Sequence, residues 1–352
     1  MPSLLSIIWN NKFNLPPLPP PDSFTGKTIL ITGGSGGLGL AAAVHFVNLG
    51  AKSVIITART AAKGEQATAS IEAQAREKSK DVVKVMELDM STFAGTKAFA
   101  DRVIKEVKEI DVVCLNAGAI STEFQTGEEG WEKMIEISLA TTLLALLLLP
   151  WMKDAGKGKA HLGIVTSGLH RRIDIKKWPK ENVIKYWSKK ENWKNGQAGY
   201  ATSKLLEQYA VNEVAKLACD ANGSPRVIVN SICPGMVHTD LGRGYTTNYA
   251  MSIAVNLFGY LACKTTEGGA RTYVRAALTP PSEHGRHYTD YQTEEEYKQM
   301  SFRRGTSSAD KKSDARNSVV GKEGQDMQAQ VWKETLEILR EHYPDVVSNI
   351  AA

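Results

Sequence analysis

The chain has 352 residues, of which 42% are hydrophobic and 23% are charged, and its formal net charge is +5. This composition excludes a wholly disordered protein, and the length suits one large α/β domain or two smaller ones. The modest charge, without a block of five like charges, argues against nucleic-acid binding.

The N-terminal segment 1–26 begins with an apolar run from Leu4 to Trp9 and continues as a proline-rich linker. The run is too short for a membrane span or a signal-peptide core, so we interpret the segment as an extension leading into the fold. A weak membrane-surface role is a less favoured alternative. The most apolar run, Leu139 to Met152, is also shorter than a span, and its unbroken apolar part ends at Pro150; it predicts a buried helix.

From Lys27 onward, short runs rich in Val and Ile alternate with longer amphipathic segments. Continuous apolar strands are typical of a parallel sheet covered by helices on both faces. The alternation predicts βαβ units and a doubly wound parallel sheet, a Rossmann-type three-layer sandwich in a single domain. The expected strands are 27–32, 53–58, 82–89, 111–118, 161–167 and 226–235. The expected helices are 38–49, 61 to about 78, 96–108, 200–218 and 325 to about 343.

We expect the catalytic domain to span residues 27–300 and to carry a Lys- and Trp-rich insertion at 168–199 near the substrate entrance. The insertion either shapes an entrance for a large or anionic substrate or forms a solvated flap with aromatic anchors. Residues 301–352 are expected to form a polar, loosely ordered stretch to about 324 and then the closing helix.

Cysteine usage points to a reducing environment. The four cysteines form no Cys-x-x-Cys pair and have no histidine neighbours at metal-ligand spacing. We interpret them as buried thiols and expect no metal site and a cytoplasmic protein. They are Cys114, Cys219, Cys233 and Cys263.

A glycine-rich loop with Gly33, Gly37 and Gly39 joins the first strand to the first helix. A helix N-terminus there offers free N–H groups and a positive dipole to a pyrophosphate, and glycines let the backbone approach it. The order strand, loop, helix therefore predicts dinucleotide binding, with Ser35 and Leu38 in the same loop.

The end of the second strand indicates which dinucleotide is bound. A carboxylate there would bind the ribose hydroxyls of NAD, but this chain has Ala58 followed by Arg59. A guanidinium pairs well with a 2′-phosphate, so the sequence favours NADP(H) over NAD. A surface arginine without this role is the alternative.

The pattern Tyr-x-x-x-Lys suits proton transfer. The pKa of tyrosine is about 10, and a lysine one helical turn away can stabilise the phenolate. Only Tyr200 begins an amphipathic helix after a glycine-containing turn, and it follows a strand tipped by Ser167, whose hydroxyl can hold a substrate carbonyl. We therefore select Tyr200/Lys204 and expect the other two pairs to be structural. The three pairs are Tyr186/Lys190, Tyr200/Lys204 and Tyr260/Lys264.

With the glycine loop, "CLNAG" and "GYATSK" in this order, the chain resembles the short-chain dehydrogenase/reductase family from Lys27 to about residue 290. It looks most like the retinol-dehydrogenase-like reductases, and fungal members associated with secondary metabolism are the nearest match. The resemblance implies an NADP(H)-binding oxidoreductase. The cofactor contacts that it adds are Asp89, Asn116, Gly118, Pro234, Val237 and Thr239, with Tyr200 and Lys204 also touching the cofactor.

One position departs from the family pattern. The family's tetrad includes an Asn on the helix after "NAG", and this chain has none there. Counting forward from Trp131 gives Ser138, whereas counting back from Pro150 gives Ile137. In the family that Asn holds, through its backbone, a water that links the lysine to solvent. The relay is therefore either slowed or kept by a backbone carbonyl.

We thus expect an NADPH-dependent reductase, or reverse dehydrogenase, of a ketone or aldehyde on a secondary-metabolite or lipid-like molecule. Tyr200 would donate the proton, Lys204 would lower the pKa of Tyr200, and Ser167 would orient the carbonyl. The alternatives are a catalytically silent NADP-binding sensor or scaffold and an isomerase of the same fold without net redox. We expect no nucleic-acid partner and no firm membrane association; a homodimer is left open. His238 either faces the nicotinamide or lies at the surface.

Overall fold

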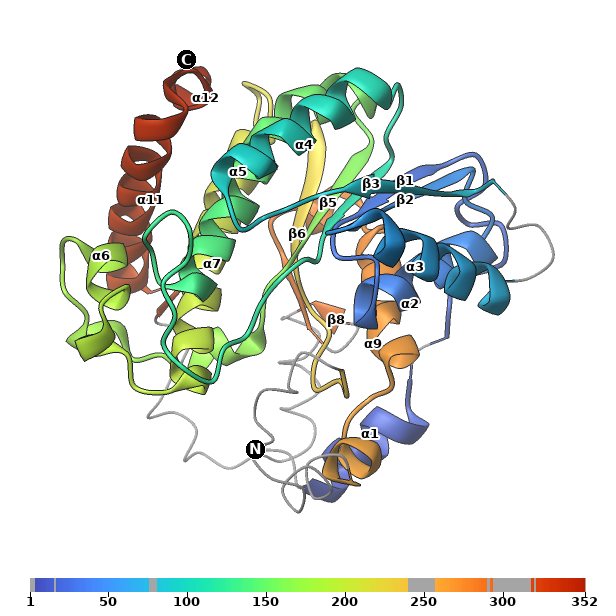
Figure 1. The fold of residues 1–352 in the computed structure, drawn as a ribbon, viewed down its shortest axis with the longest axis horizontal. Coiled ribbons are helices and arrows are strands. Elements are labelled where there is room, and N and C mark those ends of the chain that lie inside the picture. Colours follow the sequence, from blue (N-terminus) through green and yellow to red (C-terminus); the bar gives the residue numbers. More distant parts are fainter. Residues whose placement is uncertain are drawn as a thin grey trace.

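The computed structural model describes residues 4–15, 17–75, 81–239, 257–289, 292–293, 318–319 and 321–351 (Figure 1). Its strands form one sheet in the order β3-β2-β1-β4-β5-β6-β7-β8, in which β1 to β7 are parallel and β8 runs antiparallel to β7. The doubly wound parallel sheet is therefore confirmed. The strands are β1 Thr28–Ile31, β2 Ser53–Ala58, β3 Val83–Glu87, β4 Val112–Leu115, β5 Ala160–Val165, β6 Val227–Cys233, β7 His287–Thr289 and β8 Gln292–Thr293.

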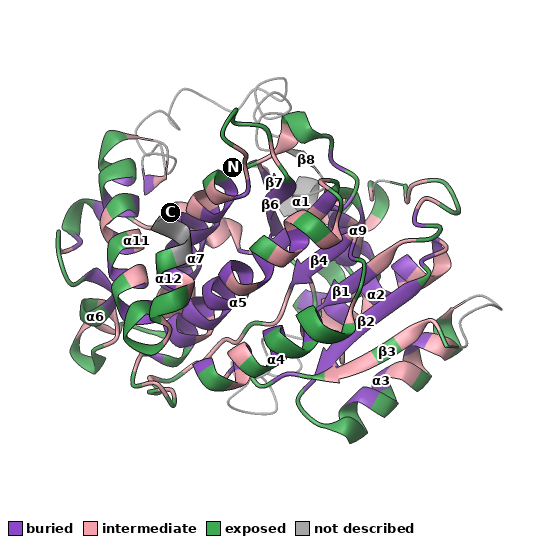
Figure 2. Ribbon diagram, turned by 90° about the horizontal axis from the view of Figure 1, so that it is seen from above, coloured by how far each residue is buried: buried purple, intermediate pink, exposed green. Residues whose placement is uncertain are grey.

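Helices cover both faces of this sheet. Helices α2, α3 and α9 lie on one face, and α4, α5, α7 and α11 lie on the other (Figures 1 and 2). The described helices are α1 Leu4–Phe13, α2 Gly37–Asn48, α3 Ala61–Gln74, α4 Phe93–Glu106, α5 Lys133–Ala155, α6 Val183–Trp187, α7 Gly196–Leu217, α9 Thr266–Ala276, α11 Lys322–His342 and α12 Pro344–Ala351. Short 3-10 turns are η1 Gly168–Arg172, η2 Ile175–Lys177, η3 Lys190–Asn192 and η5 Pro281–Glu283.

Strand β1 shows how the sequence builds two cores. Leu30 belongs to the apolar cluster under α5 and α7, whereas Ile29 and Ile31 belong to the cluster under α2 and α9. Successive side chains of a strand point to opposite faces, so a strand covered on both sides must be apolar throughout. Each of these fully buried side chains stabilises the fold by about 1.5–3 kcal/mol.

Helix α5 is longer than the predicted run, because it begins at Lys133 and continues through Pro150 to Ala155. Proline removes one backbone N–H, but Pro150 lies on the exposed side, where its ring meets no neighbouring layer. Within the described residues α5 alone is long and apolar enough to cross a membrane, and 78% of its most apolar window is buried in the protein. Its position between α4 and α7, on one face of the sheet, accounts for its apolar composition (Figure 2).

Helix α7 begins at Gly196, one turn before the predicted start at Tyr200. The Asn195 side chain caps it by accepting a hydrogen bond from the Ala198 N–H at 2.9 Å. The glycine-containing turn before Tyr200 is thus the first turn of the helix, and Tyr200 lies inside it.

The insertion and the C-terminal helix pack together. The Glu334 carboxylate of α11 accepts hydrogen bonds from the N–H groups of Val183 and Ile184 at 2.9 Å each and so caps α6. Trp178 is 6% exposed and lies 5.2 Å from Trp187 between ring centroids. The stretch predicted to be loosely ordered, 301–324, lies mostly outside the described residues.

The cysteines are all free thiols, and three of them are buried as expected. Cys219 is only partly buried, so the expectation is wrong for this residue. It lies in the loop after α7, at an isolated bridge to Pro225.

Candidate functional site

The candidate site lies where strands β1, β4, β5 and β6 end side by side. Thr32, Asn116, Ser167 and Pro234 each follow one of these parallel strands within two residues. In open parallel sheets this carboxyl edge, at the point where the strand order reverses, is where ligands bind. At this edge the chain passes from the strands into loops that begin with polar residues. Several strands are therefore shorter than their sequence runs predict.

The glycine loop forms a cradle at this edge. Gly33 and Gly37 have φ values of +67° and +55°, a left-handed conformation that favours glycine. A Cβ atom on Gly39 would lie 2.4 Å from the Gly33 oxygen, whereas Gly36 has open space around it. The N-cap of α2 is Gly36, which has no side chain to bond the N–H groups of the first helical turn. Ser35 precedes this glycine, and Leu38 lies in the first turn. The backbone therefore fits a pyrophosphate.

A hydrogen-bond network fixes the floor of the cradle. The Thr32 hydroxyl accepts hydrogen bonds from the N–H groups of Asn116 and Ala117 at 2.9 and 3.0 Å. The Asn116 amide donates to the carbonyls of Thr32 and Gly33 at 2.8 and 3.3 Å, and its oxygen accepts from the Tyr273 hydroxyl at 2.8 Å. Asn116 thus holds the loop in place, and sequence reasoning missed the part played by Tyr273.

Arg59 and Asp89 lie on adjacent strand ends. Arg59 follows β2 and Asp89 follows β3, the strand that pairs with β2, and both are exposed. Arg59 has no ion-pair partner in the part of the chain that the structure describes. The Asp89 carboxylate accepts a hydrogen bond from the Ser91 N–H at 2.9 Å. This edge therefore offers an exposed cation that a phosphate can bind and, separately, a carboxylate that can accept a hydrogen bond.

A buried lysine stabilises the Pro-Gly turn after β6. Lys264 is 2% exposed, and its Nζ donates to the Pro234 carbonyl at 3.1 Å. The backbone of Lys264 also pairs with Val237 in an isolated parallel bridge. Thr239 is the last described residue before the segment 240–256. Sequence reasoning treated Lys264 as half of a structural Tyr-x-x-x-Lys pair and did not predict that it supports the turn.

Lys204 of helix α7 contacts the backbone of β5, and Tyr200 lies one turn before it on the same helix. The Lys204 Nζ lies 5.9 Å from the centroid of the Tyr200 ring and donates to the Val165 carbonyl at 2.9 Å. Burial raises the pKa of Tyr200, while Lys204 and a side-chain hydrogen bond with Ser167 oppose this rise. The three selected residues are therefore brought together in one site, in which Lys204 is buried and Ser167 and Tyr200 are partly buried.

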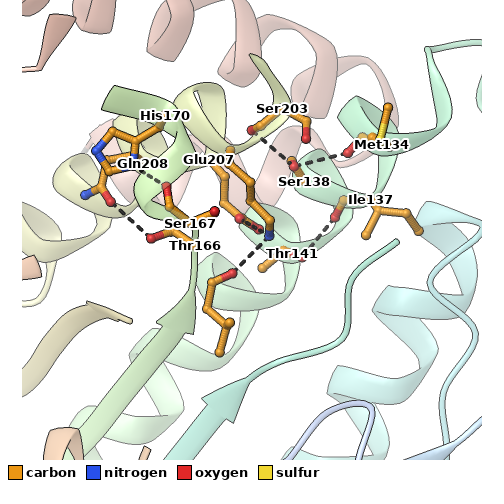
Figure 3. Close-up of polar contacts among 12 residues, drawn as sticks. Met134, Ile137, Ser138, Thr141, Thr166, Ser167, His170, Ser203, Glu207 and Gln208 are labelled. Atoms are coloured by element: carbon orange, nitrogen blue, oxygen red, sulfur yellow. Dashed lines mark hydrogen bonds and ion pairs between the residues drawn. The ribbon is translucent and has the colours of Figure 1, made fainter. Parts of the chain in front are cut away.

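Glu207, which the sequence analysis did not select, is the strongest partner of Lys204. Its Oε2 lies 2.5 Å from the Lys204 Nζ, and the residue is 3% exposed (Figure 3). A single acid three residues after the lysine, within the apolar run "KLLEQYAV", was the signal that could have revealed it.

Ser138, the candidate for the missing Asn, lies on α5 facing α7. Its hydroxyl donates to the carbonyl of Met134 at 3.1 Å and to that of Ser203 at 3.4 Å (Figure 3). The carbonyl of the alternative residue, Ile137, accepts a hydrogen bond from the Thr141 hydroxyl at 2.9 Å. The Ser138 hydroxyl thus joins the two helices next to Lys204, and its place in a tetrad stays a prediction.

The other two Tyr-x-x-x-Lys pairs do not form comparable sites. Tyr186 is 37% exposed and packs edge-on against Trp187. Tyr260 is 74% exposed, whereas its partner Lys264 is buried under the Pro-Gly turn. Neither tyrosine therefore lies in the desolvated environment in which a lysine strongly stabilises a phenolate.

The two histidines near the site differ in environment. His170 is buried and its Nδ1 lies 2.6 Å from the Ser167 carbonyl oxygen; burial, with the nearby Arg171 charge, lowers the pKa of His170 to about 4. His238 is exposed at the surface, next to Gly259.

A cavity of about 480 Å³ lies between the insertion and the first turns of α5 and α7. Three tryptophans of the insertion line it, Trp178, Trp187 and Trp193, together with Gly199 and Thr202 of α7. Thr202 is two residues from Tyr200 and therefore points to the other side of the helix. The insertion thus lines a cavity on the side of α7 away from Tyr200.

Comparisons with known proteins agree with this geometry. Residues 27–167 match the family model described as short chain dehydrogenase. The chain is 32% identical to the short-chain dehydrogenase/reductase ffsI of Aspergillus flavipes over 98% of this chain and 94% of that protein. It is also 32% identical to the short-chain dehydrogenase/reductase phmF of Phaeosphaeria nodorum, over 93% and 90% of the two chains.

Solved structures show the same fold. A short-chain dehydrogenase of Escherichia coli CFT073 in complex with NADPH has a TM-score of 0.57 at 20% identity, over 78% of this chain and all of that one. The oxidoreductase yciK of E. coli has a TM-score of 0.56 at 20% identity, over 78% and 98%. The chain belongs to the short-chain dehydrogenase/reductase family, which consists of oxidoreductases that bind a nicotinamide cofactor.

Proposed function

We propose that this protein is an NADP(H)-dependent oxidoreductase that interconverts a ketone or aldehyde with the corresponding alcohol. The observation that supports this most strongly is the convergence of Ser167, Tyr200 and Lys204 at the sheet edge that also carries the glycine cradle. These three side chains supply a hydrogen-bond donor for a carbonyl, a proton donor and a fixed positive charge.

In the reductive direction the bound nicotinamide supplies a hydride to the carbonyl carbon. Ser167 holds the carbonyl oxygen by a hydrogen bond, and Tyr200 donates its phenolic proton to the alkoxide that develops there. Lys204 stabilises the phenolate that Tyr200 leaves behind. In the oxidative direction Tyr200 takes the proton back as a base.

The preference for NADP rests on Arg59, the exposed cation at the end of β2. A guanidinium there can bind a 2′-phosphate, and the absence of a carboxylate in "ITART" removes a repulsion. The NADPH complex of the E. coli relative lends support from the same fold.

The substrate class rests on the relatives and on the insertion. Both relatives named above are fungal, and three tryptophans of the insertion line the cavity beside α7. We propose a secondary-metabolite or lipid-like carbonyl compound, handled in a reducing compartment such as the cytoplasm, where the free thiols persist.

The test is to follow NADPH and NADH absorbance with the purified full-length protein and a panel of quinones, aromatic aldehydes and cyclic ketones. We expect oxidation of NADPH by at least one compound, and its loss in Tyr200→Phe and Ser167→Ala. NADPH binding without turnover on any carbonyl would favour a silent sensor. Conversion of a substrate with unchanged absorbance would favour an isomerase.

A further inference from the structure

The charge of Lys204 is shared with a buried carboxylate on the same helix. The Lys204 Nζ lies 2.5 Å from Glu207 Oε2 and 2.9 Å from the Val165 carbonyl oxygen (Figure 3). The side chains of Lys204 and Glu207 are 9% and 3% exposed. Because an ammonium group has three N–H donors, two of them are already used inside the protein and one is left for a ligand.

No other charge faces Glu207 from the neighbouring described elements. Apart from Glu207 itself, the residues that line a void of about 10 Å³ beside it come from α5, α6, α7 and α11 and carry no charge. Such a void has room for about one water. The residues contributed by α5, α6 and α11 are Ile135, Ser138, Leu139, Thr142, Ile184 and Thr335.

The groups that face Tyr200 complete the electrostatic environment. Cys233 at the end of β6 and Glu207 both disfavour a phenolate at Tyr200, whereas Lys204 and Ser167 favour it. Tyr273 of α9 faces Tyr200 as a further neutral phenol. Lys204 is thus the cation that acts on Tyr200 among the described groups, and Glu207 offsets part of its charge.

We propose that Glu207 is a positioning residue that fixes Lys204 and keeps Tyr200 protonated at neutral pH, so that the site is poised to donate a proton to a carbonyl. This inference rests on the proposed function. A phenol that stays protonated is an acid, which suits reduction, whereas an isolated lysine beside it would favour the phenolate base needed for alcohol oxidation.

The direction of the effect follows from charge and burial. Burial by itself would lower the pKa of Lys204, but Glu207, together with Tyr200 and Cys233, outweighs it and the ammonium persists. Burial, chiefly, and then the Glu207 charge among others raise the pKa of Tyr200. Removal of the carboxylate charge therefore lowers the proton affinity of the coupled Tyr200–Lys204 pair.

The test is a pH titration of the phenolate absorbance of the full-length protein in the ultraviolet. Subtraction of the same titration for the matching Tyr200→Phe protein isolates Tyr200 from the other tyrosines. In Glu207→Gln we expect the Tyr200 step to move to lower pH by about one unit. A step that is unchanged or moves to higher pH would overturn the proposal.

Glu213→Gln is the matched control. Glu213 lies on α7 and pairs with Lys216 at 2.7 Å with the same i,i+3 spacing, but this pair is partly exposed and lies nearly two turns away. We expect the Tyr200 step to stay where it is in this control. A shift of equal size in the control would mean that any charge change on the helix moves the titration, and it would also overturn the proposal.

The Glu207→Asp variant and the turnover of the wild type complete the test. If Glu207→Gln does not fold, Glu207→Asp keeps the charge but withdraws it by one methylene, and we expect a smaller shift in the same direction. The titration needs no substrate. If the wild type turns over no carbonyl, the proposed function fails, whereas the position of the Tyr200 step still decides the role of Glu207.

Discussion

The Tyr273 hydroxyl donates a hydrogen bond to Asn116 Oδ1 over 2.8 Å and thereby ties helix α9 to the end of strand β4. Asn116 uses its amide N–H groups on the glycine loop, so the three segments form one unit. Burial raises the pKa of Tyr273 well above its ordinary value, so this phenol acts as a neutral donor.

Tyr273→Phe removes this donor and leaves a partly buried amide oxygen without it. We expect the free energy of unfolding to fall by about 1–2 kcal/mol and NADPH binding to weaken several-fold, because the glycine loop loses its support. Urea denaturation and a fluorescence titration with NADPH measure the two effects. Tyr260→Phe, at a 74% exposed position, is the control. Equal effects of both changes would contradict the structural account.

Arg59→Asp tests the choice of cofactor. The change removes a charge-assisted hydrogen bond to the 2′-phosphate and adds a repulsion, which together are worth about 1.5–3 kcal/mol. We expect the ratio of NADPH to NADH affinity to fall by about 10- to 100-fold. Lys52→Asp, exposed just before β2, is a matched charge change away from the site. An unchanged ratio in Arg59→Asp would show that another residue recognises the phosphate.

Glu334→Ala tests whether α11 holds the insertion in place. The buried Glu334 carboxylate accepts two backbone hydrogen bonds, so its removal leaves two N–H groups of α6 without partners. We expect a loss of about 2–4 kcal/mol in the free energy of unfolding and faster proteolysis within 168–199. Glu337→Ala changes a 53% exposed carboxylate on the same helix and should cost little. A similar loss of unfolding free energy in both variants would show that the Glu334 contacts with α6 do not hold the insertion in place.

The stability of the protein should depend on pH through His170. Because the pKa of His170 is lowered to about 4 in the folded protein, the unfolded chain takes up a proton first as the pH falls below about 6.5. Its contribution is therefore full above pH 6.5 and decreases as the pH falls toward 4, by about 3 kcal/mol in total. Unfolding free energies measured over this range should show a shallower dependence in His170→Gln than in the wild type. An equal slope would contradict the burial of a neutral imidazole; exposed His342→Gln is the control.

The fold could be predicted from the sequence because its strands are buried on both faces and its glycine loop has a fixed place. All six residues of the run "SVIITA" are buried, and β2 has the bounds that this run predicts. The ends of the helices were harder to predict from the sequence. Pro150 interrupts the apolar pattern but not α5, since it faces outward, and the Asn195 cap moves the start of α7 ahead of a glycine pair.

The candidate site was predictable where motifs mark it and not where tertiary contacts create it. Ser167, Tyr200 and Lys204 lie together as their positions at the strand end and on the helix require. Tyr273 and Lys264 come to the site only through packing, because their partners are 157 and 30 residues away, whereas Glu207 meets Lys204 within one helical turn. Glu207 was the easiest of the three to predict from the sequence, because it is an acid within an apolar helix.

The most direct test of the central claim is to follow deuterium from NADPH labelled at the nicotinamide C4 into the product of a carbonyl substrate found in the panel. The account predicts that wild-type protein transfers deuterium to the former carbonyl carbon. In Tyr200→Phe, which keeps the ring but removes the proton, the rate should fall by about 10²- to 10⁴-fold. Product without deuterium, or an unchanged rate in Tyr200→Phe, would contradict it.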